Sequence, residues 1–298
     1  MSAAAFVPGL LAAAEALAEF VRRHPRLVVL TGAGCSVASG IPEYRDHEGN
    51  WKARPPVTYA AFVSSEATRR RYWARSMFGW ERVSAAAPGP AHRALASLER
   101  TGHVRAVVTQ NVDTLHQRAG SRRVVDLHGR LDHVECLGCG AFVARADVQD
   151  LLTAWNAGWR AALAADPTAP AATPRPDGDV ELERDFRDFR IPDCPACGGI
   201  LKPAVVFFGE NVPRGRVESA LEALRAADAL LVVGSSLAVY SGYRFCLAAR
   251  DRGQPIAAVN LGRTRADDLF ALKAVADCGD ALREAAARLG PAAGVAAR

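Results

Sequence analysis

The stretch LVVLTGAGCSVASGIP, residues 27–42, decides the fold class. It opens with a short apolar and β-branched run, as expected of a strand that is buried on both faces of a parallel sheet. Gly32-Ala33-Gly34 follows at once, and glycines in this place let the backbone approach a pyrophosphate and present its amides to it. The full dinucleotide fingerprint is incomplete, because Val37 holds its third glycine position. Taken alone, the stretch predicts either a nucleotide-binding loop or a tight structural turn.

Similar apolar runs recur along the chain, and helical segments lie between several of them. The expected strands are residues 27–31, 104–109, 124–127, 204–208, 230–234 and 256–260. The expected helices are residues 8–24, 90–101, 215–227, 241–252 and 280–289. Strands that alternate with helices predict an α/β fold with a doubly wound, Rossmann-like parallel sheet. Ligands bind such sheets beyond the carboxyl ends of the strands, and those ends carry Gly32, Gln110, Asn111, His128, Gly234, Ser235, Ser236, Asn260, Leu261 and Gly262.

Two regions interrupt this alternation and indicate a smaller lobe inserted in the sheet domain. Residues 43–87 are rich in arginine and aromatic residues, and residues 133–200 hold four paired cysteines. We expect a single domain over residues 1–298. Its large lobe is predicted at about residues 1–42, 88–132 and 201–298, and its small lobe at about residues 43–87 and 133–200. The Pro- and Ala-rich passage 164–181 is predicted to be a mobile loop.

Composition and charge limit the class of protein. The chain has 37 basic and 32 acidic residues, and a net charge of only +5 predicts no direct nucleic-acid binding. No window approaches about 18 uncharged apolar residues, so we expect no membrane span. The N-terminal segment carries Glu15 and Glu19 and is predicted to be an amphipathic helix instead of a signal or transit peptide. We therefore expect a reducing, cytoplasmic location.

Four of the seven cysteines form two Cys-x-x-Cys pairs, Cys136 with Cys139 and Cys194 with Cys197. Four thiolates in this layout suit one tetrahedral, structural zinc ion, with the long intervening segment looped out. The alternative is four ordinary core cysteines. A zinc ion with four cysteine ligands has no open position and cannot activate water. His128, eight residues before Cys136, is then free for other chemistry.

Several blocks of sequence, taken in order, resemble one known family. They are GAGCSVASGIPEYR (32–45), TQNVDTLH (109–116), LHG (127–129), KPAVVFFGE (202–210), VVGSSLAVY (232–240) and VNLG (259–262). With the cysteine pairs, they resemble the sirtuins, the NAD-dependent protein lysine deacylases, over about residues 20–285. The pieces RRYWAR (70–75), PDGDV (176–180) and VYSGYRF (239–245) look most like the class II branch, which includes a mitochondrial lipoamidase and ADP-ribosyltransferase. Cys35 and Glu43-Tyr44 depart from the usual residues without removing a reacting group.

The resemblance implies that an acyl group moves from lysine to ADP-ribose while nicotinamide leaves NAD. A ribose hydroxyl must lose a proton in this reaction, and histidine is the default base near neutral pH. His128 is the residue that matches the family's base. A lone histidine would be interpreted as structural. Asn111 and Asp113 match residues that act on the nicotinamide ribose and carboxamide, although Asp113 is also suited to cap the following helix.

The resemblance also implies which residues hold NAD. Tyr44 and Arg45 belong to a flexible loop over the cofactor, where a guanidinium suits the pyrophosphate; an exposed loop arginine is the alternative for Arg45. Gln110 matches a contact with the ribose. The complete NAD set implied by the resemblance is Gly32, Ala33, Gly34, Ser36, Pro42, Tyr44, Arg45, Gln110, Asn111, Val112, Asp113, Gly234, Ser235, Ser236, Asn260, Leu261, Gly262 and Cys278.

The implied substrate is an acyl-lysine protein or peptide, bound as an extended strand between residues 208–210 and 237–239. Its contacts are predicted at Tyr72, Arg75, Val206, Phe207, Phe208, Gly209 and Leu237. Tyr72 and Arg75 are three residues apart on a predicted helix and resemble the pair that grips an acidic acyl chain in desuccinylating sirtuins. Alternatively, Arg75 pairs with a helix neighbour such as Glu81 and Tyr72 packs in the small lobe, while Trp73 and Phe78 form an apolar pocket.

Three other functions remain open at this point. Within the family, ADP-ribosyl transfer to a protein is an alternative main activity. Outside it, the paired cysteines also fit a zinc-ribbon adaptor for protein or nucleic acid, and a zinc hydrolase with His128 as a ligand. Absence of NAD binding would favour the adaptor. Reversible loss of activity on chelation, with the fold intact, would favour the hydrolase.

Overall fold

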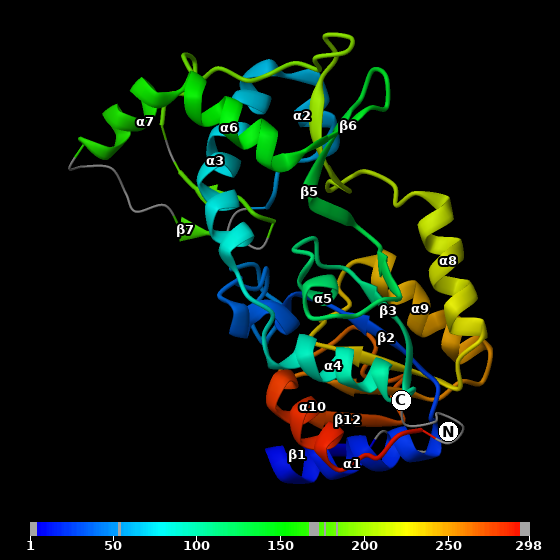
Figure 1. Ribbon diagram of the computed structural model, residues 1–298. Helices are drawn as coiled ribbons and strands as arrows, with labels where there is room; N and C mark the ends of the chain where they lie inside the picture. Colours follow the sequence, from blue (N-terminus) through cyan, green and yellow to red (C-terminus); the bar gives the residue numbers. More distant parts are fainter. Residues whose placement is uncertain (1–4, 53–54, 167–172, 176, 183, 293–298) are drawn as a thin grey trace.

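The computed structural model describes residues 5–52, 55–166, 173–175, 177–182 and 184–292. Its centre is a seven-stranded parallel sheet in the order β1-β12-β11-β10-β2-β3-β4 (Figure 1). The strands are β1 (Ala5–Pro8), β2 (Leu27–Thr31), β3 (Val104–Thr109), β4 (Val124–Asp126), β10 (Ala229–Val233), β11 (Ile256–Val259) and β12 (Leu272–Val275). The chain builds outward from β2 toward β4 on one side and later toward β12 on the other. The carboxyl ends of β2 and β10 therefore flank the switch point where such sheets bind ligands.

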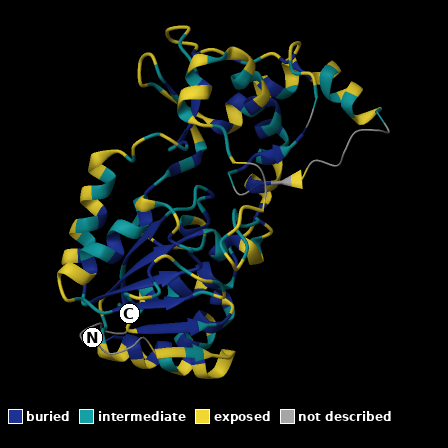
Figure 2. Cartoon of the chain, turned by 180° about the vertical axis from the view of Figure 1, so that it is seen from behind, coloured by how far each residue is buried: buried dark blue, intermediate teal, exposed yellow. Residues whose placement is uncertain are grey.

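Helices cover both faces of this sheet, because successive strand residues point to opposite faces. Leu27 and Val29 of β2 pack in one core, and Val28 and Leu30 pack in another. The first core is covered by α1 (Leu10–Arg23), α4 (Pro90–Arg100) and α10 (Cys278–Ala287), and the second by α8 (Arg214–Arg225) and α9 (Tyr240–Asp251). In Figure 2 the strands are buried and the outer helix faces are exposed. The predicted doubly wound fold and its five helices are confirmed.

A second sheet, β6-β5-β9, lies apart from the first with helices packed against it (Figure 1). Its strands are antiparallel: β5 (Gly129–Cys136), β6 (Phe142–Ala144) and β9 (Leu201–Val205). The helices of this part are α2 (Tyr59–Ser64), α3 (Glu66–Ala85), α6 (Arg145–Trp155) and α7 (Ala157–Ala164), beside a small hairpin of β7 (Thr173–Pro174) and β8 (Val180–Glu181). The short helices η1 (Ala33–Ser39) and α5 (Leu115–Arg118) follow β2 and β3. These elements enclose a third core around Phe62 and Trp73.

Three expectations need correction or restriction. Residues 204–208 do not form a strand of the parallel sheet, because β9 ends at Val205 and pairs with β5 instead. Strands β1 and β12 were not expected, since Pro8 and the charged Lys273 interrupt their apolar pattern. The mobile loop predicted at 164–181 falls partly outside the described residues, and its described part includes the β7–β8 hairpin. Over the residues that the structure describes, no helix is long and apolar enough to cross a membrane.

Candidate active site and metal centre

A cavity of about 680 Å³ opens at the carboxyl ends of β2, β3, β10 and β11. It has the size of a small-molecule or cofactor site. All the predicted catalytic, cofactor and substrate residues line this cavity except Pro42 and Arg75. Ile41 and Glu43, the neighbours of Pro42, do line it. Segments that lie far apart in the sequence therefore meet in the place that the sheet topology predicts.

The glycine loop after β2 lies directly against the loop after β10. A Cβ atom on Gly34 would lie 2.9 Å from the Cα of Gly234, and one on Gly32 would lie 2.7 Å from the Cβ of Ser235. The Gly34 amide donates to the Gly234 carbonyl at 2.9 Å. Neither glycine can be replaced without moving backbone, so the two loops form one close-packed floor. Its backbone and the hydroxyls of Ser235 and Ser236 suit a phosphorylated ligand such as NAD.

A buried polar network lies beneath the end of β3. The Ser36 hydroxyl donates to Asp113 Oδ2 at 2.6 Å, and the Asn111 side-chain amide donates to Ser36 Oγ and to the Gly32 carbonyl, both at 3.0 Å. Asp113 Oδ1 also accepts the Leu115 backbone N–H at 2.9 Å, so this carboxylate begins α5 as well. Both interpretations of Asp113 are thus compatible with its contacts. The network fixes Asn111 and Asp113 at the cavity wall before any ligand arrives.

His128 is held through both ring nitrogens at the end of β4. Its Nδ1 lies 2.9 Å from the Gln110 carbonyl oxygen, and its Nε2 lies 2.8 Å from Ser241 Oγ. A carbonyl only accepts, so the ring hydrogen of the neutral imidazole is on Nδ1 and Nε2 is left as an acceptor. Burial lowers the pKa of His128, and the nearby positive charge of Arg216 lowers it further. A neutral imidazole with an acceptor nitrogen at the cavity is the state that a general base requires.

An aromatic wall covers the opposite side of the cavity. Tyr44, Trp51 and Phe208 meet edge to face, with ring centroids 5.9–6.2 Å apart. Arg45 lies over the Trp51 ring at 4.2 Å and donates to the Gly49 carbonyl at 2.7 Å. The Arg45 loop is therefore folded onto the cavity, with the guanidinium among the lining residues.

Tyr72 and Arg75 of α3 are separated by their surroundings. Tyr72 is buried and lines the cavity, whereas Arg75 lies behind the lining and forms ion pairs with Asp179 at 3.1 Å and Glu181 at 3.6 Å. The alternative partner Glu81 is wrong for Arg75, because Glu81 pairs with Arg160 at 2.8 Å. The structure therefore links Arg75 to the β7–β8 hairpin, and a direct contact with an acyl group stays a prediction.

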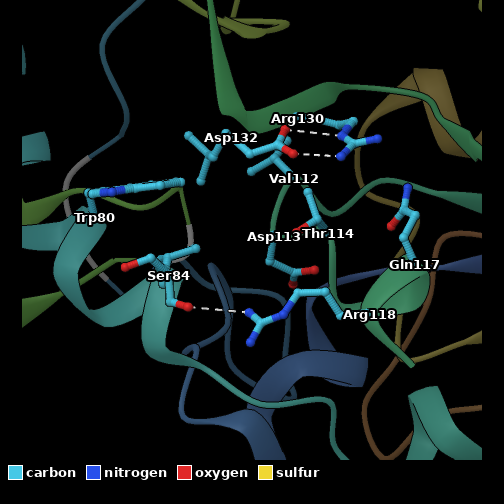
Figure 3. A pocket seen from close by; sticks show the side chains of 11 residues that line it. Trp80, Ser84, Val112, Asp113, Thr114, Gln117, Arg118, Arg130 and Asp132 are labelled. Atoms are coloured by element: carbon cyan, nitrogen blue, oxygen red, sulfur yellow. Dashed lines mark hydrogen bonds and ion pairs between the residues drawn. The ribbon is translucent and has the colours of Figure 1, made fainter. Parts of the chain in front are cut away.

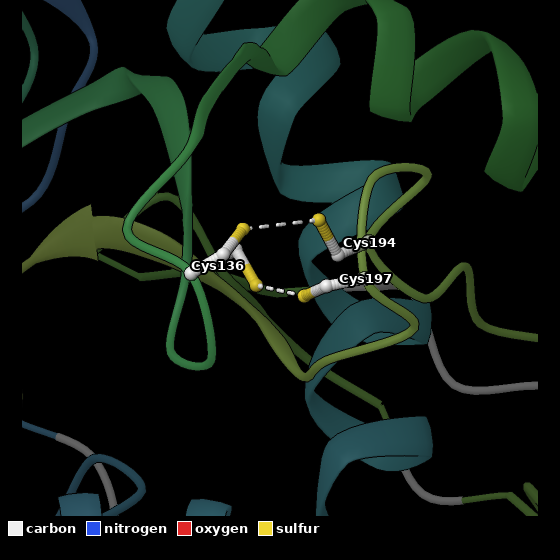
Figure 4. Close-up of side chains that lie close together, drawn as sticks. Cys136, Cys194 and Cys197 are labelled. Atoms are coloured by element: carbon white, nitrogen blue, oxygen red, sulfur yellow. Dashed lines mark hydrogen bonds between the residues drawn. The ribbon is translucent and has the colours of Figure 1, made fainter.

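The four paired cysteines converge at the end of β5 (Figure 4). Their sulfur atoms all lie within 4.8 Å of one another, with 3.5 Å between Cys136 and Cys197 and 3.8 Å between Cys139 and Cys194. Tetrahedral zinc–thiolate bonds of about 2.3 Å place sulfur atoms roughly 3.8 Å apart, so the cluster fits a structural zinc ion. His128 does not belong to the cluster, since its nitrogens contact Gln110 and Ser241.

Comparison with known proteins agrees with this geometry. The Sir2 family profile matches residues 32–241. This chain belongs to the Sir2 family. It is 59% identical to "NAD-dependent protein deacetylase 2" of Bradyrhizobium diazoefficiens, over 90% of this chain and 96% of that protein. It is 47% identical to "NAD-dependent protein deacylase Sirt4" of Drosophila melanogaster, over 89% of this chain and 84% of that one, which partly supports the class II resemblance. A solved structure described as "Sir2-p53 peptide-NAD+" matches with a TM-score of 0.70 and 30% identity, over 92% of this chain and 95% of that one.

Some cavity residues of this sirtuin were missed from the sequence. Trp51, Asp177, Ser241 and Arg244 all line the cavity. Ser241 and Arg244 lie in VYSGYRF, which carried the class II resemblance but suggested no chemistry. Their position directly after the expected substrate segment 237–239 is the signal that would have found them.

A second, smaller cavity of about 440 Å³ adjoins the first (Figure 3). Arg118 donates to the Ser84 carbonyl at 3.4 Å there, and Arg130 is paired with Asp132 at 2.5 Å. Asp113 lines both cavities, and so does Val112. The loop after β3 therefore forms a wall between the two.

Proposed function

We propose that this sirtuin is an NAD-dependent protein lysine deacylase that transfers the acyl group of acyl-lysine to ADP-ribose and releases nicotinamide. The single observation that carries the proposal is the state of His128. Its Nδ1–H is held by the Gln110 carbonyl, so the lone pair of the neutral ring is on Nε2, at the wall of a cavity of cofactor size. Names of homologues that are up to 59% identical support the same activity.

NAD would lie on the floor formed by the loops after β2, β10 and β11, and it supplies an electrophilic sugar carbon with nicotinamide as leaving group. Asn111, held by Gly32 and Ser36, would orient the nicotinamide ribose, and Asp113 would face the carboxamide. His128 would take the proton of a ribose hydroxyl. The four-cysteine zinc site would hold the second sheet together without taking part in the chemistry.

The peptide would bind as an extended strand between Phe208–Gly209 and Leu237–Val239. Leu237 supports this site, because it is a non-glycine residue with φ of 56°, a strained conformation that concentrates at ligand sites. Gly209, with φ of 81°, adopts on the opposite wall a left-handed conformation that glycine accommodates without strain. Backbone recognition predicts loose sequence preference around the lysine.

We further propose that acidic acyl groups such as succinyl or glutaryl are removed faster than acetyl. Beside Tyr72, the cavity meets Asp177, whose pKa is raised by burial, and behind it lie Arg75 and Asp179. Burial and the charge of Asp177 also raise the pKa of Asp179. Partial protonation of these carboxyls would leave positive charge on Arg75 that an acyl carboxylate could share. Arg75 Nη2 is buried and makes no hydrogen bond within 3.5 Å, its partner Glu181 being 3.6 Å away, and this loose pairing supports the proposal.

The test is an NAD-dependent deacylation assay, read by mass spectrometry, over peptides that carry acetyl-, succinyl-, glutaryl- and methylglutaryl-lysine. His128→Ala should abolish turnover while its zinc content and melting temperature stay near wild type. Arg75→Met should reverse the acyl ranking, and Arg160→Met, which breaks the neighbouring Glu81 pair, is the matched control. A wild type that prefers acetyl-lysine would refute the acidic pocket. Protein-bound ADP-ribose as the main product would favour the transferase alternative.

Two further points remain proposals. The large and small lobes are proposed at the boundaries given above, with residues 133–200 as the zinc module. A reducing compartment such as the cytoplasm is proposed because none of the seven cysteines forms a disulfide and four of them suit a zinc ion.

A further inference from the structure

Ser241 hydrogen-bonds to Nε2 of His128, the nitrogen that would accept a proton. It is the second residue of α9, and its Oγ lies 2.8 Å from Nε2 and at the cavity wall. Gly242 follows, and a Cβ there would lie 2.5 Å from the side-chain oxygen of Gln110. Because Gln110 also holds Nδ1 of His128, the first turn of α9 and the end of β3 clamp the imidazole between them.

The chemistry of the ring defines the direction of this hydrogen bond. Nδ1 carries the hydrogen that the Gln110 carbonyl accepts, so the neutral ring offers one lone pair, on Nε2. Ser241 fills it by donating its hydroxyl hydrogen. A substrate hydroxyl that is to lose its proton must therefore either displace Ser241 from Nε2 or reach His128 through Ser241.

We propose that Ser241 is a catalytic residue that relays the proton from the ribose hydroxyl to His128. In this step the sugar O–H bond breaks and its proton joins Ser241 Oγ, while the proton already on Oγ moves to Nε2. The serine ends as a neutral hydroxyl and His128 as an imidazolium. The sugar oxygen keeps its electron pair and attacks the acyl carbon. The proposal rests on the proposed deacylase function, since it assigns Ser241 a place in that reaction.

The hydrogen bond between Ser241 and His128 can form with the imidazole either neutral or protonated. When Nε2 gains a proton, the Ser241 hydroxyl turns and accepts from it, so His128 is never left without a partner. A charge-assisted hydrogen bond to the imidazolium is stronger than the neutral one, so the serine should hold the pKa of His128 above the value that burial and Arg216 alone would give.

The experiment compares Ser241→Ala and Ser241→Thr with the wild type, and Tyr243→Phe is the control because it removes a hydroxyl from the same helix away from the cavity. Ser241→Ala should lower kcat roughly 10²-fold, the typical contribution of positioned proton transfer, with little change in the Kd for NAD. Ser241→Thr should recover most of the rate. Ser241→Ala combined with His128→Ala should be no slower than His128→Ala alone, because both residues serve one proton path.

A second measurement requires no turnover. In protein without NAD, the NMR titration of the His128 ring should move to lower pH in Ser241→Ala and stay unchanged in Tyr243→Phe. Wild-type kcat in Ser241→Ala would show displacement instead of relay and overturn the proposal, and so would an unshifted His128 titration. A wild type without NAD-dependent deacylation would defeat the proposed function and the relay together. In that case a shifted titration would still show that the Ser241–His128 contact exists.

Discussion

Replacement of Gly129 by alanine tests how tightly the fold holds His128. Gly129 follows His128 and has φ of 84°, and a Cβ there would lie 2.0 Å from the Ala204 carbonyl oxygen and 2.9 Å from the Cα of Val205. A left-handed conformation costs an alanine about 1–2 kcal/mol. The clash forces β5 and β9 apart where Gly129 pairs with Val205, and loss of one or two backbone hydrogen bonds costs about 1 kcal/mol each. The expected destabilisation is therefore roughly 2–4 kcal/mol.

Gly253→Ala is the matched control, because Gly253 has φ of 68° but no atom within 4 Å of an added Cβ. It carries the conformational cost without the clash. In thermal unfolding followed by circular dichroism, Gly253→Ala should lower Tm by roughly 2–8 °C and Gly129→Ala by roughly 4–16 °C, at 2–4 °C per kcal/mol. Deacylation should fall only in Gly129→Ala, since the Val206 amide also donates to the His128 carbonyl at 2.7 Å. Equal Tm values for the two variants would refute the reasoning.

Three further predictions follow from the site. Cys197→Ser should release zinc, measured as metal per chain, and lose the cooperative unfolding of the second sheet, whereas Cys246→Ala, at a buried thiol in α9, should keep its zinc. Asn111→Ala should lower kcat much more than it weakens NAD binding measured by calorimetry; an equal loss of affinity with unchanged turnover would contradict its role. Burial and the charge of His92 lower the pKa of His116 to about 3. As the pH falls below 6.5, this histidine is therefore protonated in the unfolded chain before it is protonated in the folded protein. The free energy of unfolding should then fall by up to about 1.4 kcal/mol per pH unit. The slope of urea-unfolding free energy between pH 6.5 and 4 should flatten in His116→Gln, and an unchanged slope would exclude this histidine as the cause.

The sequence predicted those parts of the fold that depend on local pattern. The runs that became β2, β3, β10 and β11 are buried on both faces, so their composition alone identified a parallel sheet. Strand β12 was not predicted because Lys273 interrupts its apolar pattern. This lysine is buried, and it pairs with Asp267 at 2.8 Å. A partner six residues away and in a loop leaves no periodic signal.

In the candidate site, too, some residues could be predicted from the sequence and others could not. His128, Asn111 and the glycine loops lie at strand ends, where topology brings separate segments together, so their convergence could be expected. The partner of Arg75 could not be predicted, because Asp179 is more than a hundred residues away in the sequence. It meets α3 through the packing of the β7–β8 hairpin. Ser241 was missed for a similar reason: its hydroxyl matters through a ring nitrogen 113 residues earlier in the chain.

Strand β5 connects the candidate base to the candidate zinc site, although the two sites have separate roles. β5 begins at Gly129, beside His128, and ends at Cys136, in the cysteine cluster. Eight residues of extended chain span roughly 26 Å, far beyond any coordination distance. β5 pairs with β9 at both of its ends, Cys136 opposite Leu201 and Gly129 opposite Val205, and the register is irregular between Gly129 and Val134. Zinc would hold the Cys136 end of this strand pair, and the Val206 amide holds the His128 carbonyl beside the Gly129 end. We therefore expect zinc to act on the base only by holding the second sheet together, so that loss of zinc and loss of the fold occur together.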